Sequence, residues 1–225
     1  GPRAAPVLSA GRCFTFGAEG RLTCLDLASG AVRWRRCTAD EFAVPPAFFG
    51  AGSTPLVVDD RLFVIVGGHP RAGVVAFDVA TGRTLWESIG PDDFPPPPVR
   101  IQRDRPPEKL AGYASPKLAT INGRRHLLCF MRPGLAAVDP ETGERMFAIW
   151  FRSRLHDSVN AAQPVMVGDR ILLSAAYDTG ATLLEVAPDG GSAAVVWQDE
   201  SAMQNHWSTT IEHGGFLYGF SGRHE

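Results

Sequence analysis

The sequence predicts an all-β protein, a β-propeller built from four-stranded antiparallel blades. Three observations lead to this fold class. Similar units recur about every 50 residues, each unit contains short apolar strands separated by turns, and no segment longer than one turn has the apolar spacing of a buried helix face. Strand-rich repeats of roughly 40–50 residues are typical of propeller blades and not of helical solenoids.

The composition is that of a folded, turn-rich chain. Of the 225 residues, 44% are hydrophobic and 20% charged, with 24 Gly and 18 Pro. A formal net charge of −2 gives no strong field toward polyanions, so no nucleic-acid partner is expected. No apolar run approaches the roughly 20 residues that cross a bilayer, so no membrane-spanning segment is expected.

Four repeats align along the chain, followed by the opening strands of a fifth. They cover approximately residues 5–36, 53–88, 114–151 and 162–200, with a partial copy at 207–225 and a proline-rich insertion at 89–113. The aromatic residue that ends each repeat gives the period: Trp34, Trp86, Phe147 and Trp197 are separated by 52, 61 and 50 residues. The longest interval contains the insertion, which we expect to follow an extended polyproline-like path over the channel mouth or to dock a partner.

Each repeat predicts four strands in order. The first follows a proline, the second is an apolar run such as 62–66, the third ends at an aspartate, and the fourth leads to the aromatic. The turn between the third and fourth strands reads Asp-x-x-Thr/Ser-Gly, in which Asp bonds the backbone and Gly supplies a positive φ. Its residues are Asp26, Asp78 and Asp139 with Gly30, Gly82 and Gly143.

The terminal aromatic is expected to pack its ring between neighbouring blades. Replacing a buried Trp86 with Ala should therefore cost about 3–5 kcal/mol. The third repeat carries Phe147 in place of tryptophan, and the fourth lacks the turn aspartate.

The four cysteines do not form a disulfide framework. If the hairpin around residues 17–20 has a four-residue loop, Cys13 and Cys24 face each other with Cβ atoms roughly 4.5–5.5 Å apart. Two states are open, a cross-strand disulfide or two thiols that act as small hydrophobes, and we favour the thiols. The six histidines show no metal-ligand spacing, so neither a metal site nor a catalytic residue is predicted.

The repeats resemble those of pyrroloquinoline-quinone-like (PQQ-like, quinoprotein-type) β-propellers. Residues 25–34 and 77–86 carry the resemblance, which extends over essentially the whole chain. It implies a ring of seven or eight blades and a location outside the cytoplasm. Because four and a half blades leave two apolar faces open, we expect the sequence to be a fragment of a longer chain whose signal peptide is not in these residues.

Alternating strand directions place the connections between repeats, and the turns between second and third strands, at one end of every blade, which we call the loop face. Counting back from the proline of each first strand places Gly52, Tyr113, Ala161 and Trp207 along the central channel. The ligand-binding candidates of the loop face are Tyr113, Asn160, His206, Trp207, His69, Arg132 and Tyr177, with His156 and Asp157 nearby. For several of them a packing or turn role is the competing interpretation, as for His69 beside Pro70.

The sequence favours a non-catalytic propeller that binds a protein or small-ligand partner through its loop face, with no cofactor. The alternative implied by the resemblance is a PQQ-dependent dehydrogenase, an alcohol- or sugar-oxidising enzyme, with PQQ and calcium held partly by blades outside this sequence. Such enzymes typically have an adjacent cysteine pair and acidic calcium ligands. These 225 residues contain no adjacent cysteines, and no acidic cluster stands at the first-strand starts. A glycan-binding propeller that uses Trp207 and Tyr113 is a third hypothesis.

Overall fold

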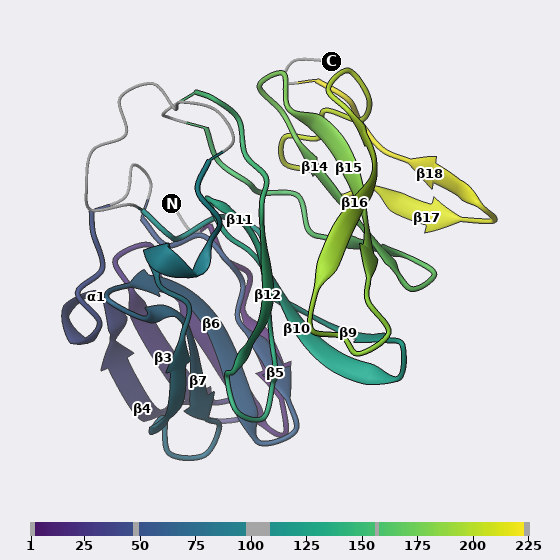
Figure 1. Ribbon diagram of the computed structural model, residues 1–225. Helices are drawn as coiled ribbons and strands as arrows, with labels where there is room; N and C mark the ends of the chain where they lie inside the picture. Colours follow the sequence, from purple (N-terminus) through teal and green to yellow (C-terminus); the bar gives the residue numbers. More distant parts are fainter. Residues whose placement is uncertain (1–2, 47–49, 98–108, 156–157, 223–225) are drawn as a thin grey trace.

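The blades are consecutive antiparallel sheets, as shown by a computed structural model that describes residues 3–46, 50–97, 109–155 and 158–222 (Figure 1). Four sheets have four strands each, paired in sequence order. Their strands are β1 (Val7–Ser9), β2 (Arg12–Phe16), β3 (Arg21–Asp26) and β4 (Val32–Cys37); β5 (Leu56–Val58), β6 (Arg61–Gly68), β7 (Ala72–Asp78) and β8 (Thr84–Ser88); β9 (Lys117–Ile121), β10 (Arg124–Phe130), β11 (Gly134–Val138) and β12 (Arg145–Trp150); and β13 (Val165–Val167), β14 (Arg170–Ala175), β15 (Gly180–Val186) and β16 (Ala193–Asp199).

A fifth sheet contains β17 (Ile211–His213) and β18 (Phe216–Tyr218). The short helical segments are α1 (Thr38–Glu41), which follows β4, and a 3-10 turn (Pro91–Asp93), which follows β8. No helix in the described part of the chain is long and apolar enough to span a membrane. The structure therefore confirms the all-β, partial-propeller fold class.

The hydrophobic core lies between successive sheets, because alternate residues of each strand point to opposite neighbours. In β6, Leu62, Val64 and Val66 join the cluster shared with the first blade. Phe63 and Ile65 of the same strand join the cluster shared with the third blade. This two-sided burial explains why the middle strands read as continuous apolar runs.

The Asp-to-Gly turns form as the sequence predicts. The Asp26 carboxylate accepts hydrogen bonds from the Ser29 amide at 2.9 Å and the Ser29 hydroxyl at 2.7 Å. Asp78 accepts the equivalent bonds from Thr81 at 2.7 and 2.6 Å. Because these bonds favour the charged form, they lower the pKa of both carboxyls below the usual range.

The tryptophans pack on the glycines of these turns in the following blade. A Cβ atom on Gly82 would lie 2.7 Å from Cδ2 of Trp34, and one on Gly143 would lie 2.6 Å from Cδ2 of Trp86. The indole of Trp34 donates to the carbonyl of Val79 at 3.1 Å. Both tryptophans are half-buried and not fully buried, so the expected loss for Trp86→Ala falls to about 2–3 kcal/mol.

The contact between the third and fourth blades is built differently. Phe147 is buried and packs at 6.0 Å, ring to ring, against His126 of β10. The fully buried His126 places Nε2 3.2 Å from the carbonyl oxygen of Gly190 in the fourth blade. Trp197, the fourth terminal aromatic, is 43% exposed.

The predicted pairing of Cys13 with Cys24 is wrong by one residue. Phe14 pairs with Cys24, and Cys13 pairs with Leu25. The Gly17 amide donates to the Arg21 carbonyl at 2.9 Å, so the hairpin closes around three residues and not four. All four cysteines are free thiols, which agrees with the interpretation that we favoured.

The connections between strands lie at two ends of the blades, and backbone hydrogen bonds link neighbouring connections at each end. At the loop face, the turn amide of His69 donates to Phe42 at 2.9 Å, and that of Arg132 donates to Leu110 at 3.0 Å. At the other end, here called the turn face, Leu27 donates to Gly11 at 2.9 Å. The insertion at 89–113 is anchored at Asp93. Residues 98–108, which hold part of its expected polyproline-like path, lie outside the described residues.

Candidate binding site at the channel mouth

A cavity of about 550 Å³ opens at the loop face where the first strands begin. Its described lining residues are Arg3, Gly52, Tyr113, Ala161 and Trp207. Each stands three residues before the position that directly precedes a first strand, which is proline in four repeats and Thr210 in the fifth. All five repeats therefore contribute the same sequence position to one cavity.

Hydroxyl groups hold the first strands in place around this cavity. The Ala5 amide donates to Oγ1 of Thr54 at 3.0 Å, and the Thr54 amide donates to Oγ of Ser115 at 2.9 Å. The Gln163 amide donates to Oγ1 of Thr209 at 3.0 Å. Sequence reasoning missed these residues, although the hydroxyl side chains at equivalent positions of three repeats were a readable signal.

Tyr113 is positioned by close packing against Gly52 and by a backbone hydrogen bond to the buried residue Asn160. A Cβ on Gly52 would lie 2.3 Å from Cδ1 of Tyr113, so the phenol ring lies directly across the glycine backbone. The Tyr113 amide donates to the carbonyl of Asn160 at 2.9 Å. Asn160 is 2% exposed, and its side-chain nitrogen donates to the carbonyls of Met131 at 2.9 Å and Phe151 at 3.0 Å.

Trp207 is supported from behind by a second buried group. Its indole lies 4.0 Å, ring to ring, from the imidazole of His206 at an interplanar angle of 31°. His206 is 5% exposed, and its Nε2 is hydrogen-bonded at 2.9 Å to the hydroxyl of Tyr177. The stack leaves Trp207 itself 58% exposed at the cavity.

The seven candidate residues thus take three different places. Tyr113 and Trp207 line the cavity, while Asn160, His206 and Tyr177 lie behind them and hold them. His69 and Arg132 lie in loop-face turns outside the described cavity lining. His156 and Asp157 lie outside the described residues. Ligand binding by any of these residues remains a prediction.

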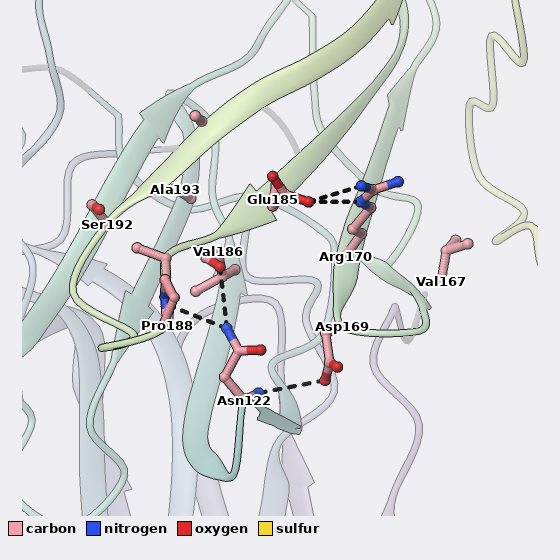
Figure 2. Close-up of a pocket in the computed structure, with 11 residues that line it drawn as sticks. Asn122, Val167, Asp169, Arg170, Glu185, Val186, Pro188, Ser192 and Ala193 are labelled. Carbon is pink, nitrogen blue, oxygen red and sulfur yellow. Dashed lines mark hydrogen bonds and ion pairs between the residues drawn. The ribbon is translucent and has the colours of Figure 1, made fainter.

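A larger cavity of about 660 Å³ lies at the turn face beside the fourth blade (Figure 2). Arg170 and Glu185 project from neighbouring strands there and form an ion pair at 2.8 Å. The side chain of Asn122 donates to the carbonyl of Val186 at 3.1 Å. The turn-face cavity takes its lining from the third and fourth repeats only, so it is a weaker candidate than the channel mouth, to which every repeat contributes.

The described lining of the channel mouth does not fit a quinone–calcium site. Calcium takes carboxylate and carbonyl oxygens as ligands, and the five lining residues include no carboxylate or side-chain amide. Within the described residues, no three His, Cys, Asp or Glu side chains group closely enough to hold a metal ion. We therefore derive no chemical step through such a cofactor.

Four-stranded blades with Asp-to-Gly turns between their third and fourth strands, packed together through interblade indoles, define a partial β-propeller of the quinoprotein type. The chain belongs to the family described as outer membrane protein assembly factor BamB, whose model matches residues 1–223.

Solved structures share the fold. BamB from Moraxella catarrhalis is 21% identical with a TM-score of 0.58, and the match covers 98% of this chain and 56% of that one. Quinohemoprotein alcohol dehydrogenase from Comamonas testosteroni is 14% identical with a TM-score of 0.54, covering 96% of this chain and 39% of that one. The chain thus spans little more than half of the BamB structure. A search of curated proteins gave no match.

Proposed function

We propose that this chain is a non-catalytic binding platform that engages protein partners through its loop face, as part of an assembly factor for outer-membrane proteins. The observation that carries the proposal is the channel mouth, where one position from each of the five repeats meets in a single cavity. The family's description supports protein partners of this kind. The proposal places the chain outside the cytoplasm, where outer-membrane proteins are assembled.

The mechanism is the presentation of preorganised aromatic groups. Tyr113 and Trp207 are held by buried partners, so few side-chain rotamers remain to be ordered when a partner binds. Tyrosine and tryptophan are also the residues that most often dominate binding energy at protein interfaces. The site supplies binding and no bond-breaking step.

The direct test is a titration of the chain with a bacterial outer-membrane β-barrel protein diluted unfolded from urea, followed by fluorescence anisotropy. We expect saturable binding that weakens at least tenfold in the double variant Tyr113→Ala/Trp207→Ala. The matched control, Arg170→Ala/Glu185→Ala, changes two exposed side chains of the turn face and should leave the affinity unchanged. Absence of binding, or loss only in the control, would contradict the proposal.

A parallel calorimetric titration with PQQ, with and without calcium, tests the enzyme alternative. The platform function predicts no heat of binding, since the described mouth residues offer calcium no carboxylate. Submicromolar, calcium-dependent binding would instead favour a quinoprotein dehydrogenase.

A further inference from the structure

We propose that the channel mouth binds an aromatic side chain that is presented together with a carboxylate on an extended peptide. The ring stacks against Trp207 and Tyr113, and the carboxylate pairs with Arg3. This inference rests on the proposed function and names the chemistry that a partner must offer.

The two aromatic side chains of the lining, Trp207 and Tyr113, favour a flat, apolar group as ligand. Trp207 is 58% exposed and backed by His206, and the Tyr113 ring is fixed across Gly52, so neither side chain must be ordered on binding. Gly52 and Ala161 add almost no side chain to the lining, which leaves room beside the aromatic groups. A cavity of about 550 Å³ is large enough for a ring and its adjoining backbone.

The polar groups select an anion and disfavour a sugar. The described lining contains one charged side chain, Arg3, and a guanidinium pairs with carboxylates through several N–H donors. The remaining side-chain polar groups there are one phenol and one indole N–H, while Gly52 and Ala161 contribute none. A sugar would bring several hydroxyl groups that need fixed partners, and an aromatic ring needs none. An aromatic carboxylate therefore matches the lining better than a glycan does.

The carboxylate can come from two sources, an aspartate beside the aromatic residue or the carboxyl terminus of an aromatic residue. Two short probes represent them: acetyl-Gly-Phe-Asp-amide and acetyl-Gly-Gly-Phe with a free carboxyl terminus. Each probe has one control peptide without the charge (Asn in place of Asp, or a terminal amide) and one control peptide without the ring (Leu in place of Phe). Binding of all six to the 225-residue chain is measured by calorimetry.

We expect at least one charged aromatic probe to bind, and its uncharged and ring-free control peptides to bind at least fivefold more weakly. The variant Arg3→Gln should abolish the difference between charged and uncharged probes while leaving the preference for a ring. Trp207→Ala should weaken binding at least tenfold. Its matched control is Trp197→Ala, which removes an indole that is 43% exposed on β16 and should have no effect.

Equal binding of the phenylalanine and leucine probes, or undiminished binding by Trp207→Ala, would overturn the inference. Failure of the inference is separable from failure of the proposed function. If the unfolded outer-membrane protein binds at the loop face and neither charged aromatic probe competes with it, the platform stands and this ligand chemistry is wrong. If that protein does not bind at all, the platform itself fails.

Discussion

Neighbouring blades are joined in two ways, and the difference shows what an interblade contact requires. Between the second and third blades, the Trp86 indole lies on Gly143 and donates to the Pro140 carbonyl at 3.3 Å. Between the third and fourth blades, His126 comes from a different strand and faces the carbonyl of Gly190 at 3.2 Å. In both, a ring nitrogen meets a backbone carbonyl beside a left-handed glycine. The left-handed glycine is therefore the constant part of the contact, and the aromatic ring that faces it can be exchanged.

The largest effect is expected at the glycine beneath an indole. Gly143→Ala adds a Cβ that would lie 2.6 Å from Trp86 at a backbone φ of 75°, so backbone strain and overpacking together should destabilise the fold by about 2–5 kcal/mol. The matched control is Gly123→Ala, which has a φ of 77° and no atom within 4 Å of the added Cβ. Denaturant unfolding should show only the strain of about 1–2 kcal/mol there. Equal losses would mean that the indole does not need the glycine.

The next effect is expected from the indole itself. Trp86→Ala should lower the unfolding free energy by about 2–3 kcal/mol, because it removes a half-buried ring and its hydrogen bond. Trp197→Ala removes an equivalent residue that is 43% exposed, so its loss should stay below about 1 kcal/mol. A loss below about 1 kcal/mol for Trp86→Ala as well would remove the basis for the blade-packing motif.

A smaller loss is expected at the histidine contact. His126→Leu keeps an apolar side chain against Phe147 but removes the ring nitrogens that face the carbonyls of Arg124 and Gly190, which should destabilise by about 1–3 kcal/mol. Thermal and urea unfolding both measure this difference. A loss greater than that of Trp86→Ala would show that the two kinds of contact are not equivalent.

The smallest effect is expected in the dependence of the unfolding free energy on pH under acidic conditions. The pKa of Asp78 is lowered in the folded chain by its bonds to Thr81, so this carboxylate stabilises the fold above its unfolded pKa of about 3.9. That stability is lost as the pH falls through the folded value. Asp78→Asn should therefore unfold with a weaker dependence on pH below about 4. Identical acid profiles for the variant and the parent chain would contradict this account of the turn.

The sequence predicts the fold well because its signals are local and repeated: a proline before the first strand, an aspartate and a glycine in the turn, and an aromatic at the end. It predicts the hairpin register poorly, because the Gly17–Arg21 hydrogen bond that shortens the loop leaves no mark on strand composition. The Cys13–Cys24 pairing failed for that reason.

The binding site was predictable only in part. Counting from the prolines places Tyr113 and Trp207 at the channel mouth, where the structure has them. The same counting puts Asn160 and His206 one residue earlier, and successive residues of an extended chain point in opposite directions. Both side chains are buried behind the lining. The His206 ring stacks on Trp207, whereas Asn160 reaches Tyr113 through its backbone carbonyl.

The most direct test of the account changes the channel mouth without removing any side chain from it. Gly52→Ala introduces a Cβ that would lie 2.3 Å from the Tyr113 ring, so the ring must move. Gly191→Ala is the control, since its nearest atom outside its chain neighbours is 3.6 Å away. Titration with the unfolded outer-membrane protein should show at least fivefold weaker binding for Gly52→Ala and unchanged binding for Gly191→Ala. Full affinity in a folded Gly52→Ala chain would contradict the claim that the preorganised mouth is the binding site.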